Sequence, residues 1–181
     1  MTIACLGWGS LIWDPREFPL SSDWHDDGPL LPIEFARFSK RGRVTLVIVA
    51  GCRMVPSLWA EVAVTSLENA VEKLRIREDR PPRSSIGYWT EKENSGHLLV
   101  QEIGHWARER RIQAVVWAAL PPKNSHGNEV KPGIEEVLKR LKNSDPEERR
   151  AAEQYIRKAH SQIRTEYRDI IERELGWNAG N

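Results

Sequence analysis

The chain opens with a short apolar run that ends abruptly at glycine, and this junction limits what the sequence can form. Residues Ile3 to Leu6 predict a buried strand, and Gly7-Trp8-Gly9-Ser10-Leu11 follows directly. Glycine adopts backbone conformations that other residues avoid and lets a ligand approach the main chain closely. We therefore expect a tight loop whose amides at Gly9, Ser10 and Leu11 bind a small anion or oxyanion. A plain turn that leads to a packed Trp13 is the alternative.

The spacing of these glycines argues against three familiar functional loops. The chain contains no Gly-x-x-x-x-Gly-Lys-Ser/Thr sequence, and the run after Leu6 lacks the third glycine of a dinucleotide-binding fingerprint. It also lacks the Gly-x-Ser-x-Gly elbow that presents a nucleophilic serine in hydrolases. We therefore expect the loop to bind through its backbone rather than to use Ser10 as a nucleophile.

The composition indicates a single domain and points away from two classes of partner. With 181 residues, the chain suits one domain with an appended helical segment. Its formal net charge of +1 suggests neither a nucleic acid nor a membrane surface as partner. No stretch approaches the ~18 apolar residues of a membrane span, and no signal-peptide pattern precedes the first strand, so we expect a soluble, cytoplasmic protein.

The cysteines and histidines follow no pattern typical of a metal site. Cys5 and Cys52 are too few for a disulfide framework or a thiolate zinc site, and we expect both to be reduced. None of the five histidines belongs to a His-x-x-x-His pair. The run His25-Asp26-Asp27 combines possible ligands, but a polar surface loop is the simpler interpretation. We therefore expect no metal site.

The hydrophobic periodicity predicts an α+β chain. Strands are expected at 3–6, 31–39, 43–50, 58–64, 84–90 and 112–120. Helices are expected from a cap at Thr65 or Ser66 to Arg80, across 98–111 and 134–141, and from an N-cap at Asp145 to a stop at Gly176. Around His160 the last helix either continues or breaks. Lys40-Arg41-Gly42 predicts a hairpin turn. We expect residues 1–122 to form the core and residues 123–181 a helical extension packed on it.

Glu78 is the acidic residue whose position best suits proton transfer. The predicted helix closes at Pro81-Pro82, which places Glu78 near its end. A carboxylate there faces the negative end of the helix dipole, and partial burial would suit it to act as general acid and base. Its neighbours form an Arg-Glu-Asp-Arg string, so a solvent-exposed ion pair is the alternative interpretation.

Three segments occur in order along the first half of the chain. They are Gly7-Trp8-Gly9-Ser10-Leu11-Ile12-Trp13, then Arg37-Phe38-Ser39 with Gly42-Arg43-Val44-Thr45-Leu46, and last Leu74-Arg75-Ile76-Arg77-Glu78 with Gly87-Tyr88. Together they resemble motifs of the γ-glutamylcyclotransferase-like family, especially its glutathione-degrading ChaC-type branch. Three departures stand out: Trp8 replaces the usual Tyr, Arg75 replaces Asp, and the interval from Glu78 to Gly87 is longer.

The resemblance implies a fold, a reaction and a set of site residues. The fold would be a small mixed β-barrel-like sheet with surrounding helices. The reaction would be an attack by the free α-amine of a γ-glutamyl compound on its own γ-carbonyl, which releases 5-oxoproline and an amine or peptide without a cofactor. The resemblance carries the catalytic role to Glu78. The residues expected to bind the substrate are Gly7, Trp8, Gly9, Ser10, Leu11, Arg37 and Tyr88.

Two further functions fit the same features. One is a non-catalytic module that binds a small carboxylate or a protein through the same cavity. The other is a maturation enzyme that acts on a γ-glutamyl group attached to a carrier. The C-terminal helices, roughly Ile134 to Leu175, have no counterpart in the resemblance. Packing on their own domain is the simplest role for them, and the alternatives are a cap over the pocket, a homodimer surface or the binding of a protein partner.

Overall fold

The chain is an α+β protein, as predicted. The computed structural model describes residues 1–39 and 42–178. Within these ranges, the strands form a four-stranded sheet of order β5-β1-β7-β6 and a three-stranded sheet of order β3-β2-β4, accompanied by five α-helices. We expected one barrel-like sheet, but the described residues form two sheets and no closed barrel.

The chain divides into two compact units, each built from two stretches of sequence. The first unit contains residues 1–31 and 56–120, and the second contains residues 32–55 and 121–181. Residues 32–55 thus group with the C-terminal helices, whereas the sequence pattern placed them in the N-terminal core. The predicted division into a core of residues 1–122 and a helical extension of residues 123–181 stays a prediction.

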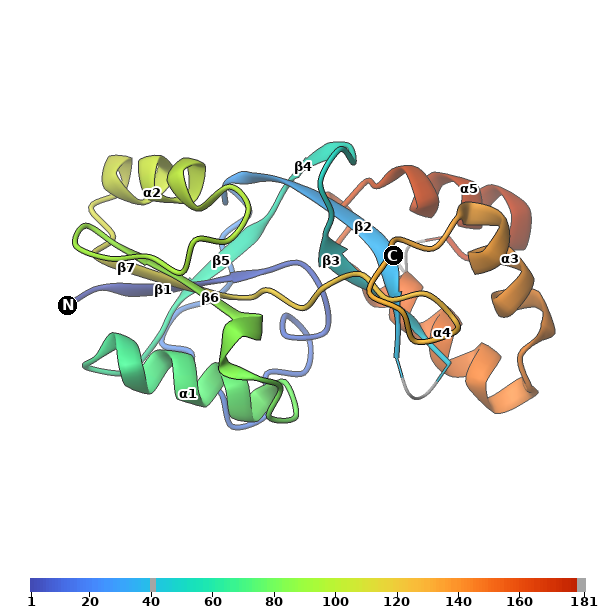
Figure 1. Ribbon diagram of the computed structural model, residues 1–181, viewed down its shortest axis with the longest axis horizontal. Coiled ribbons are helices and arrows are strands. Elements are labelled where there is room, and N and C mark those ends of the chain that lie inside the picture. The colour runs from blue at the N-terminus through green and yellow to red at the C-terminus, as the bar shows by residue number, and fades with distance from the viewer. Residues whose placement is uncertain (40–41, 179–181) are drawn as a thin grey trace. The chain divides into compact units, whose positions relative to one another are not determined.

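A four-stranded sheet forms the centre of the first unit. Its strands are β1 (Ile3–Gly7), β5 (Leu58–Glu61), β6 (Ile86–Thr90) and β7 (Ala114–Ala118). β1 runs parallel to β7 and antiparallel to β5, and β6 pairs antiparallel with β7. The helices α1 (Leu67–Arg77) and α2 (Val100–Glu109) cover opposite faces of this sheet (Figure 1). Both central strands are therefore buried on both sides, which explains their continuous apolar sequences.

The two faces of this sheet are packed differently. On the α1 face, Cys5 and Val116 pack with the apolar stripe of α1 formed by Ala70, Val71 and Leu74. On the other face, indole rings replace aliphatic side chains. A Cβ atom on Gly87 would lie 2.1 Å from the Trp117 ring, and one on Gly104 would lie 2.3 Å from the Trp89 ring. Part of the high tryptophan content therefore serves the core.

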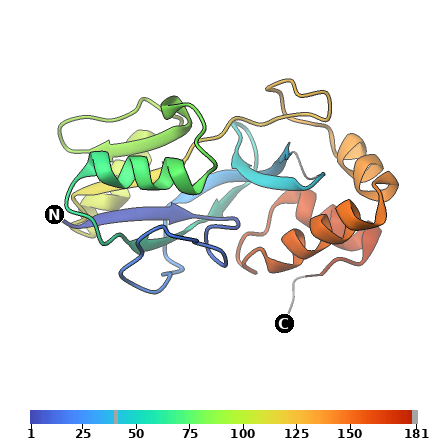
Figure 2. The same ribbon diagram turned by 90° about the horizontal axis from the view of Figure 1, so that it is seen from below.

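The second unit combines a small sheet with three helices (Figure 2). Its elements are β2 (Leu30–Phe38), β3 (Val44–Ile48), β4 (Met54–Pro56), α3 (Ile134–Asn143), α4 (Pro146–Lys158) and α5 (Glu166–Leu175). β2 and β3 form the predicted antiparallel hairpin. Of its predicted turn, Lys40 and Arg41 lie outside the described residues. Phe35 packs edge-on against Tyr155, and the Tyr155 hydroxyl bonds the amide of Leu46, so α4 is joined to both strands.

Helix boundaries follow their predicted capping residues closely. The Ser66 hydroxyl accepts a hydrogen bond from the Asn69 amide at 3.2 Å, and the Asp145 carboxylate accepts from Glu147 and Glu148. Gly176 ends α5 with a φ of 70°, a conformation that favours glycine. None of the helices in the described ranges has the length and apolar character needed to cross a bilayer. The cytoplasmic localisation stays a prediction.

A buried arginine holds the connection between α4 and α5, and its loss should destabilise the second unit. Arg168 is fully buried and donates to the carbonyl oxygens of Ala159, His160 and Ile163 at 2.7 to 3.0 Å, and to Glu172 at 3.0 Å. Arg168→Met should lower the free energy of unfolding by about 3 kcal/mol, because these acceptors lose a buried donor. Urea unfolding measures the change, with Arg150→Met as the exposed control. Equal stability of the two variants would contradict this role.

A buried carboxylate should make stability depend on pH in a defined direction. Glu34 is fully buried and accepts hydrogen bonds from the amides of Phe35 at 2.8 Å and Tyr167 at 3.2 Å. Burial raises the pKa of its carboxyl group above the ordinary value. The folded state therefore binds this proton more tightly than the unfolded state does. The stabilisation is complete below the unfolded-state pKa of about 4.3 and is lost as the pH rises through the folded-state pKa.

Comparison with Glu34→Gln isolates this contribution, because the amide does not titrate. The free energy of unfolding of the wild type, relative to that of the variant, should fall as the pH rises from about 4 toward neutrality. Urea unfolding at several pH values measures it. A difference that is constant with pH, or that rises, would show that burial of Glu34 is not the dominant cause.

Candidate functional site

The candidate residues of the first unit gather at one end of its sheet. β1 ends at Gly7, and β7, which runs parallel to it, ends at Ala118. Ile86 pairs with Ala118, so β6 begins at this same end. The glycine loop therefore lies at the sheet end where α1 leads, through a short 3₁₀ turn at Arg83–Ser85, into β6. Topology alone thus brings the loop and the end of α1 toward each other.

The glycine loop folds into consecutive turns that leave several amides unused. The Ile12 amide donates to the Gly9 carbonyl at 3.0 Å, and the Asp14 amide donates to the Ser10 carbonyl at 2.8 Å. Trp8 and Leu11 are buried. The described residues provide no hydrogen-bond acceptor for the amides of Gly9, Ser10 and Leu11. These three donors are the groups that the sequence predicted for binding an anion or oxyanion.

Gly7 is required for a different reason than the one predicted from the sequence. Neither Gly7 nor Gly9 belongs to the described residues with positive φ, so a special backbone dihedral is not what glycine supplies here. Instead, a Cβ atom on Gly7 would lie 2.5 Å from the indole ring of Trp24. The missing side chain makes room for Trp24, which packs against the core on the α1 face.

Arg77, the last residue of α1, joins Glu78 to the glycine loop. Its Nη1 donates to Glu78 Oε1 at 2.6 Å, while its Nη2 donates to Ser10 Oγ at 3.1 Å and to the Asp14 carbonyl at 2.7 Å. One guanidinium group therefore contacts both predicted parts of the site. Sequence reasoning assigned Arg77 no role, although its place beside Glu78 at a helix end was the available signal.

A second arginine reinforces the same junction. Arg16 Nη1 donates to the Arg77 carbonyl at 2.9 Å and to Asp79 Oδ1 at 2.8 Å. Arg16, Asp79 and Arg80 have φ values of 53°, 63° and 56°, a left-handed conformation that costs a residue other than glycine roughly 1 kcal/mol. Such conformations persist where surrounding contacts hold them, and they often occur at functional sites. Five described residues other than glycine have a positive φ, and three of them flank Glu78 or the glycine loop.

Glu78 lies at the C-cap of α1, with 15% of its side chain exposed. The prediction that it lies near the end of this helix is confirmed, and its carboxylate is near the loop rather than in bulk solvent. The negative charge of Glu78 also affects Cys5, a residue of β1. Burial raises the pKa of the Cys5 thiol, and the nearby negative charge of Glu78 raises it further. Oε1 is engaged by Arg77, and Oε2 has no hydrogen-bond partner among the described residues.

Tyr88 lies on the same face of the sheet as Glu78. It pairs with Val116, which pairs with Cys5, and all three pack on the α1 side. Tyr88 also lines a cavity of about 390 Å³ together with Arg83, Asn94 and His97. In this cavity His97 Nδ1 lies 2.7 Å from Ser95 Oγ, and the Ser95 hydroxyl bonds the backbone of Tyr88. The cavity is lined by both polar and apolar side chains and lies beside the start of β6.

Arg37 belongs to the second unit, whereas the other candidates belong to the first. Its Nη1 donates to the Pro121 carbonyl at 2.7 Å, and burial lowers the pKa of its guanidinium group. A cation held in this way has a structural role within its own unit. Binding of substrate by Arg37 stays a prediction.

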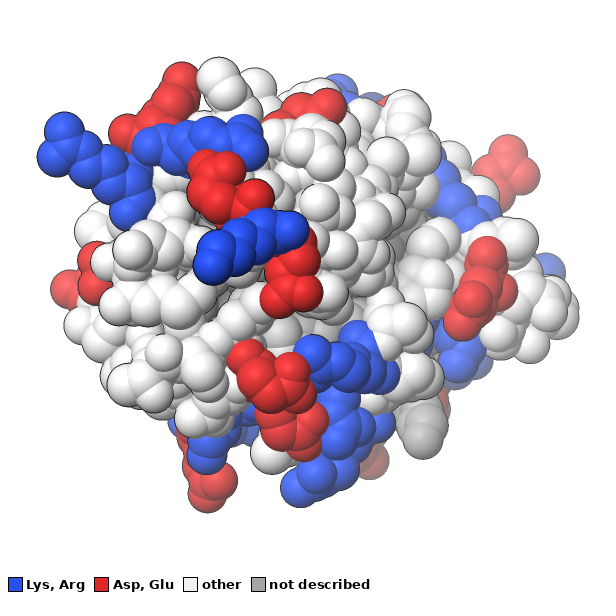
Figure 3. All heavy atoms as spheres, turned by 60° about the vertical axis from the view of Figure 1, so that its left-hand side comes forward, with Lys and Arg blue, Asp and Glu red and all other residues white. Residues whose placement is uncertain are grey.

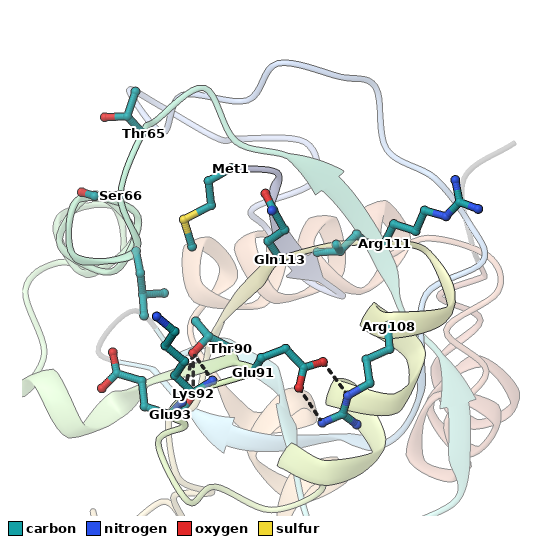
Figure 4. A pocket seen from close by; sticks show the side chains of 12 residues that line it. Met1, Thr65, Ser66, Thr90, Glu91, Lys92, Glu93, Arg108, Arg111 and Gln113 are labelled. Atoms are coloured by element: carbon teal, nitrogen blue, oxygen red, sulfur yellow. Dashed lines mark hydrogen bonds and ion pairs between the residues drawn. The ribbon is translucent and has the colours of Figure 1, made fainter.

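A larger cavity, of about 1010 Å³, lies at the opposite end of the sheet (Figure 4). Met1, Thr65, Ser66 and Gln113 border it, and the rim carries an ion pair in which Arg108 Nε lies 2.7 Å from Glu91 Oε1. α1 begins here and ends at Glu78, so its 11 residues separate the two places by about 16 Å. Neither of these two cavities is lined by Glu78 or by residues 7–11.

The charges of the described residues form no evident ion site. On the face in Figure 3, basic and acidic side chains alternate. Within residues 1–39 and 42–178, no group of three or more His, Cys, Asp or Glu side chains is arranged to hold a metal ion.

Comparison of the chain with protein-family models, with curated proteins and with solved structures found no match. Assignment to a family thus rests on the motif resemblance, and the case for a function rests on the geometry around Glu78.

The contact between Gly7 and Trp24 predicts a loss of stability on substitution. Gly7→Ala should lower the free energy of unfolding by about 2 kcal/mol, because the added methyl group overlaps the indole ring. Gly133→Ala is the matched control, since nothing lies within 4 Å of a Cβ atom there. Urea unfolding of both variants measures the difference. A Gly7→Ala variant as stable as Gly133→Ala would show that Trp24 moves aside freely.

Proposed function

We propose that the protein is a γ-glutamylcyclotransferase-like enzyme that converts a γ-glutamyl compound into 5-oxoproline and a free amine or peptide. One observation carries the proposal: the Arg77 guanidinium bonds both the Glu78 carboxylate and Ser10 of the glycine loop. The supposed general acid and base and the supposed anion-binding amides thus come from segments far apart in the sequence and meet at one sheet end. The barrel-like fold of that family is part of the proposal. The observation behind it is an α+β chain with two sheets.

The reaction moves protons from the attacking nitrogen to the leaving nitrogen and passes through one charged intermediate. Glu78 takes a proton from the substrate's α-ammonium group, and the freed amine nitrogen attacks the γ-carbonyl carbon. The carbonyl oxygen becomes an oxyanion, which the amides of Gly9, Ser10 and Leu11 stabilise. As the amide bond breaks, Glu78 returns its proton to the leaving nitrogen, and the ring nitrogen loses its remaining surplus proton to solvent, from which the released amine is protonated. Ring closure within one molecule depends mainly on orientation, so no cofactor is needed.

The remaining candidates complete the proposed binding site. Trp8 and Gly7 shape the loop, and Tyr88 contributes from β6 on the α1 face. Substrate binding by Arg37 is implied by the motif resemblance alone. The partner is a small γ-glutamyl substrate rather than a nucleic acid or a membrane. The leaving group stays open, and a γ-glutamyl group on a carrier, or a homodimer or protein partner bound through the C-terminal helices, fits the same chemistry.

Product formation from a panel of γ-glutamyl amines and peptides tests the proposal. The purified protein should release 5-oxoproline from at least one of them, and Glu78→Gln should lower kcat by about 10³-fold, because the amide cannot accept the proton. Glu102→Gln, an exposed position on α2, is the matched control and should retain full activity. Absence of product across the panel, or full activity of Glu78→Gln, would refute the proposal.

The ion pair between Arg77 and Glu78 also favours a second candidate function. Because Oε1 of Glu78 is bound by Arg77 at 2.6 Å, the carboxylate has a structural contact that needs no catalysis. A module that binds a small carboxylate at the loop amides would retain this geometry. Thermal stabilisation by 5-oxoproline or glutamate that persists in Glu78→Ala, without turnover by the wild type, would identify this function.

A further inference from the structure

Arg77 is the most deeply buried basic side chain at the candidate site. Only 5% of its side chain is exposed, compared with 47% for the neighbouring Arg16. Burial of a cation is costly unless directed partners replace water. Arg77 has three such partners, one on Glu78, one on Ser10 and one on Asp14. Its position is therefore set by contacts on two sides.

The geometry of arginine suits this position and that of lysine does not. A planar guanidinium group donates in several fixed directions, whereas an ammonium group is a compact charge on a flexible stem. Here Nη1 and Nη2 point to different segments, and the buried Nε has no hydrogen-bond partner among the described residues. An unsatisfied buried donor lowers stability, so optimal folding alone does not account for arginine at this place.

We propose that Arg77 is a positioning residue for the cyclisation. It holds Oε1 of Glu78, so that Oε2 faces the substrate's ammonium group, and through Ser10 and Asp14 it fixes the loop whose amides meet the developing oxyanion. The near absence of exposed surface means that Arg77 itself does not contact the substrate. This inference rests on the proposed function, and it adds that the base and the oxyanion donors are aligned by one side chain.

Arg77→Lys tests the alignment while it conserves the charge. We expect kcat to fall about 100-fold, as a misplacement of about 1 Å typically causes, with a smaller change in KM.

In Arg77→Ala, added guanidinium ion should restore part of kcat, which a general loss of stability would not allow. Arg75→Lys, on the same helix and paired with Glu72, is the matched control and should keep wild-type kinetics. Ser10→Ala should show less than additive loss when combined with Arg77→Lys.

A measurement that needs no turnover separates this inference from the proposed function. Amide hydrogen exchange of residues 9–14 should be faster in Arg77→Lys than in Arg75→Lys, because the loop loses its anchor. If the wild type turns over and Arg77→Lys matches it in kcat and in loop exchange, the inference is wrong and the proposed function stands. If the wild type forms no 5-oxoproline, the proposed function fails, and unchanged loop exchange would then also exclude Arg77 as the anchor.

Discussion

The site depends on the hydrogen bonds that the buried Arg77 cation needs in place of water. Its partners Ser10 and Asp14 lie 67 and 63 residues earlier in the chain. Moving the glycine loop away from α1 would leave a charged group buried without partners, at a cost of several kcal/mol. The loop and Glu78 are therefore held together by an energetic constraint rather than by chain proximity. Arg16 adds a second, more exposed link between the same two segments.

The sheet topology determines which end of the first unit carries this site. The parallel pair of β1 and β7 places the ends of both strands at the same sheet edge, and α1 crosses one face toward that edge. The carboxyl ends of parallel strands are common ligand sites because loops and helix ends converge there. The larger cavity lies at the other edge, where an ion pair between Arg108 and Glu91 already satisfies part of its charged rim.

Local sequence signals predicted the local structure well. Ser66, Asp145 and Gly176 mark helix ends because their side chains or backbone preferences act within a few residues. The β2–β3 hairpin is likewise a short-range feature. β4 was missed, since Met54–Pro56 is too short to show periodicity and contains a proline.

Long-range features were harder to derive from sequence. The grouping of residues 32–55 with the C-terminal helices depends on contacts such as the one between Glu34 and Tyr167, 133 residues apart. The packing role of Gly7 was not predicted either, because Trp24, the neighbour that requires it, lies much further along the β1–β2 connection. Position along α1 indicated Glu78, but the direction of the Arg77 side chain follows only from the folded chain. The parts of the site that sequence predicted are those carried by motif residues, and the part it missed is the side chain that joins them.

The two oxygens of Glu78 have different surroundings, and this difference bears on the second half of the proposed reaction. A base that removes a proton from the ammonium group must later release it to the leaving nitrogen. Arg77 bonds Oε1 at 2.6 Å, so in the proposed reaction Oε2 is the oxygen that both takes and releases the proton. The amides of the glycine loop gain their acceptor only when the oxyanion forms, so in that reaction they act on the transition state rather than on the bound substrate.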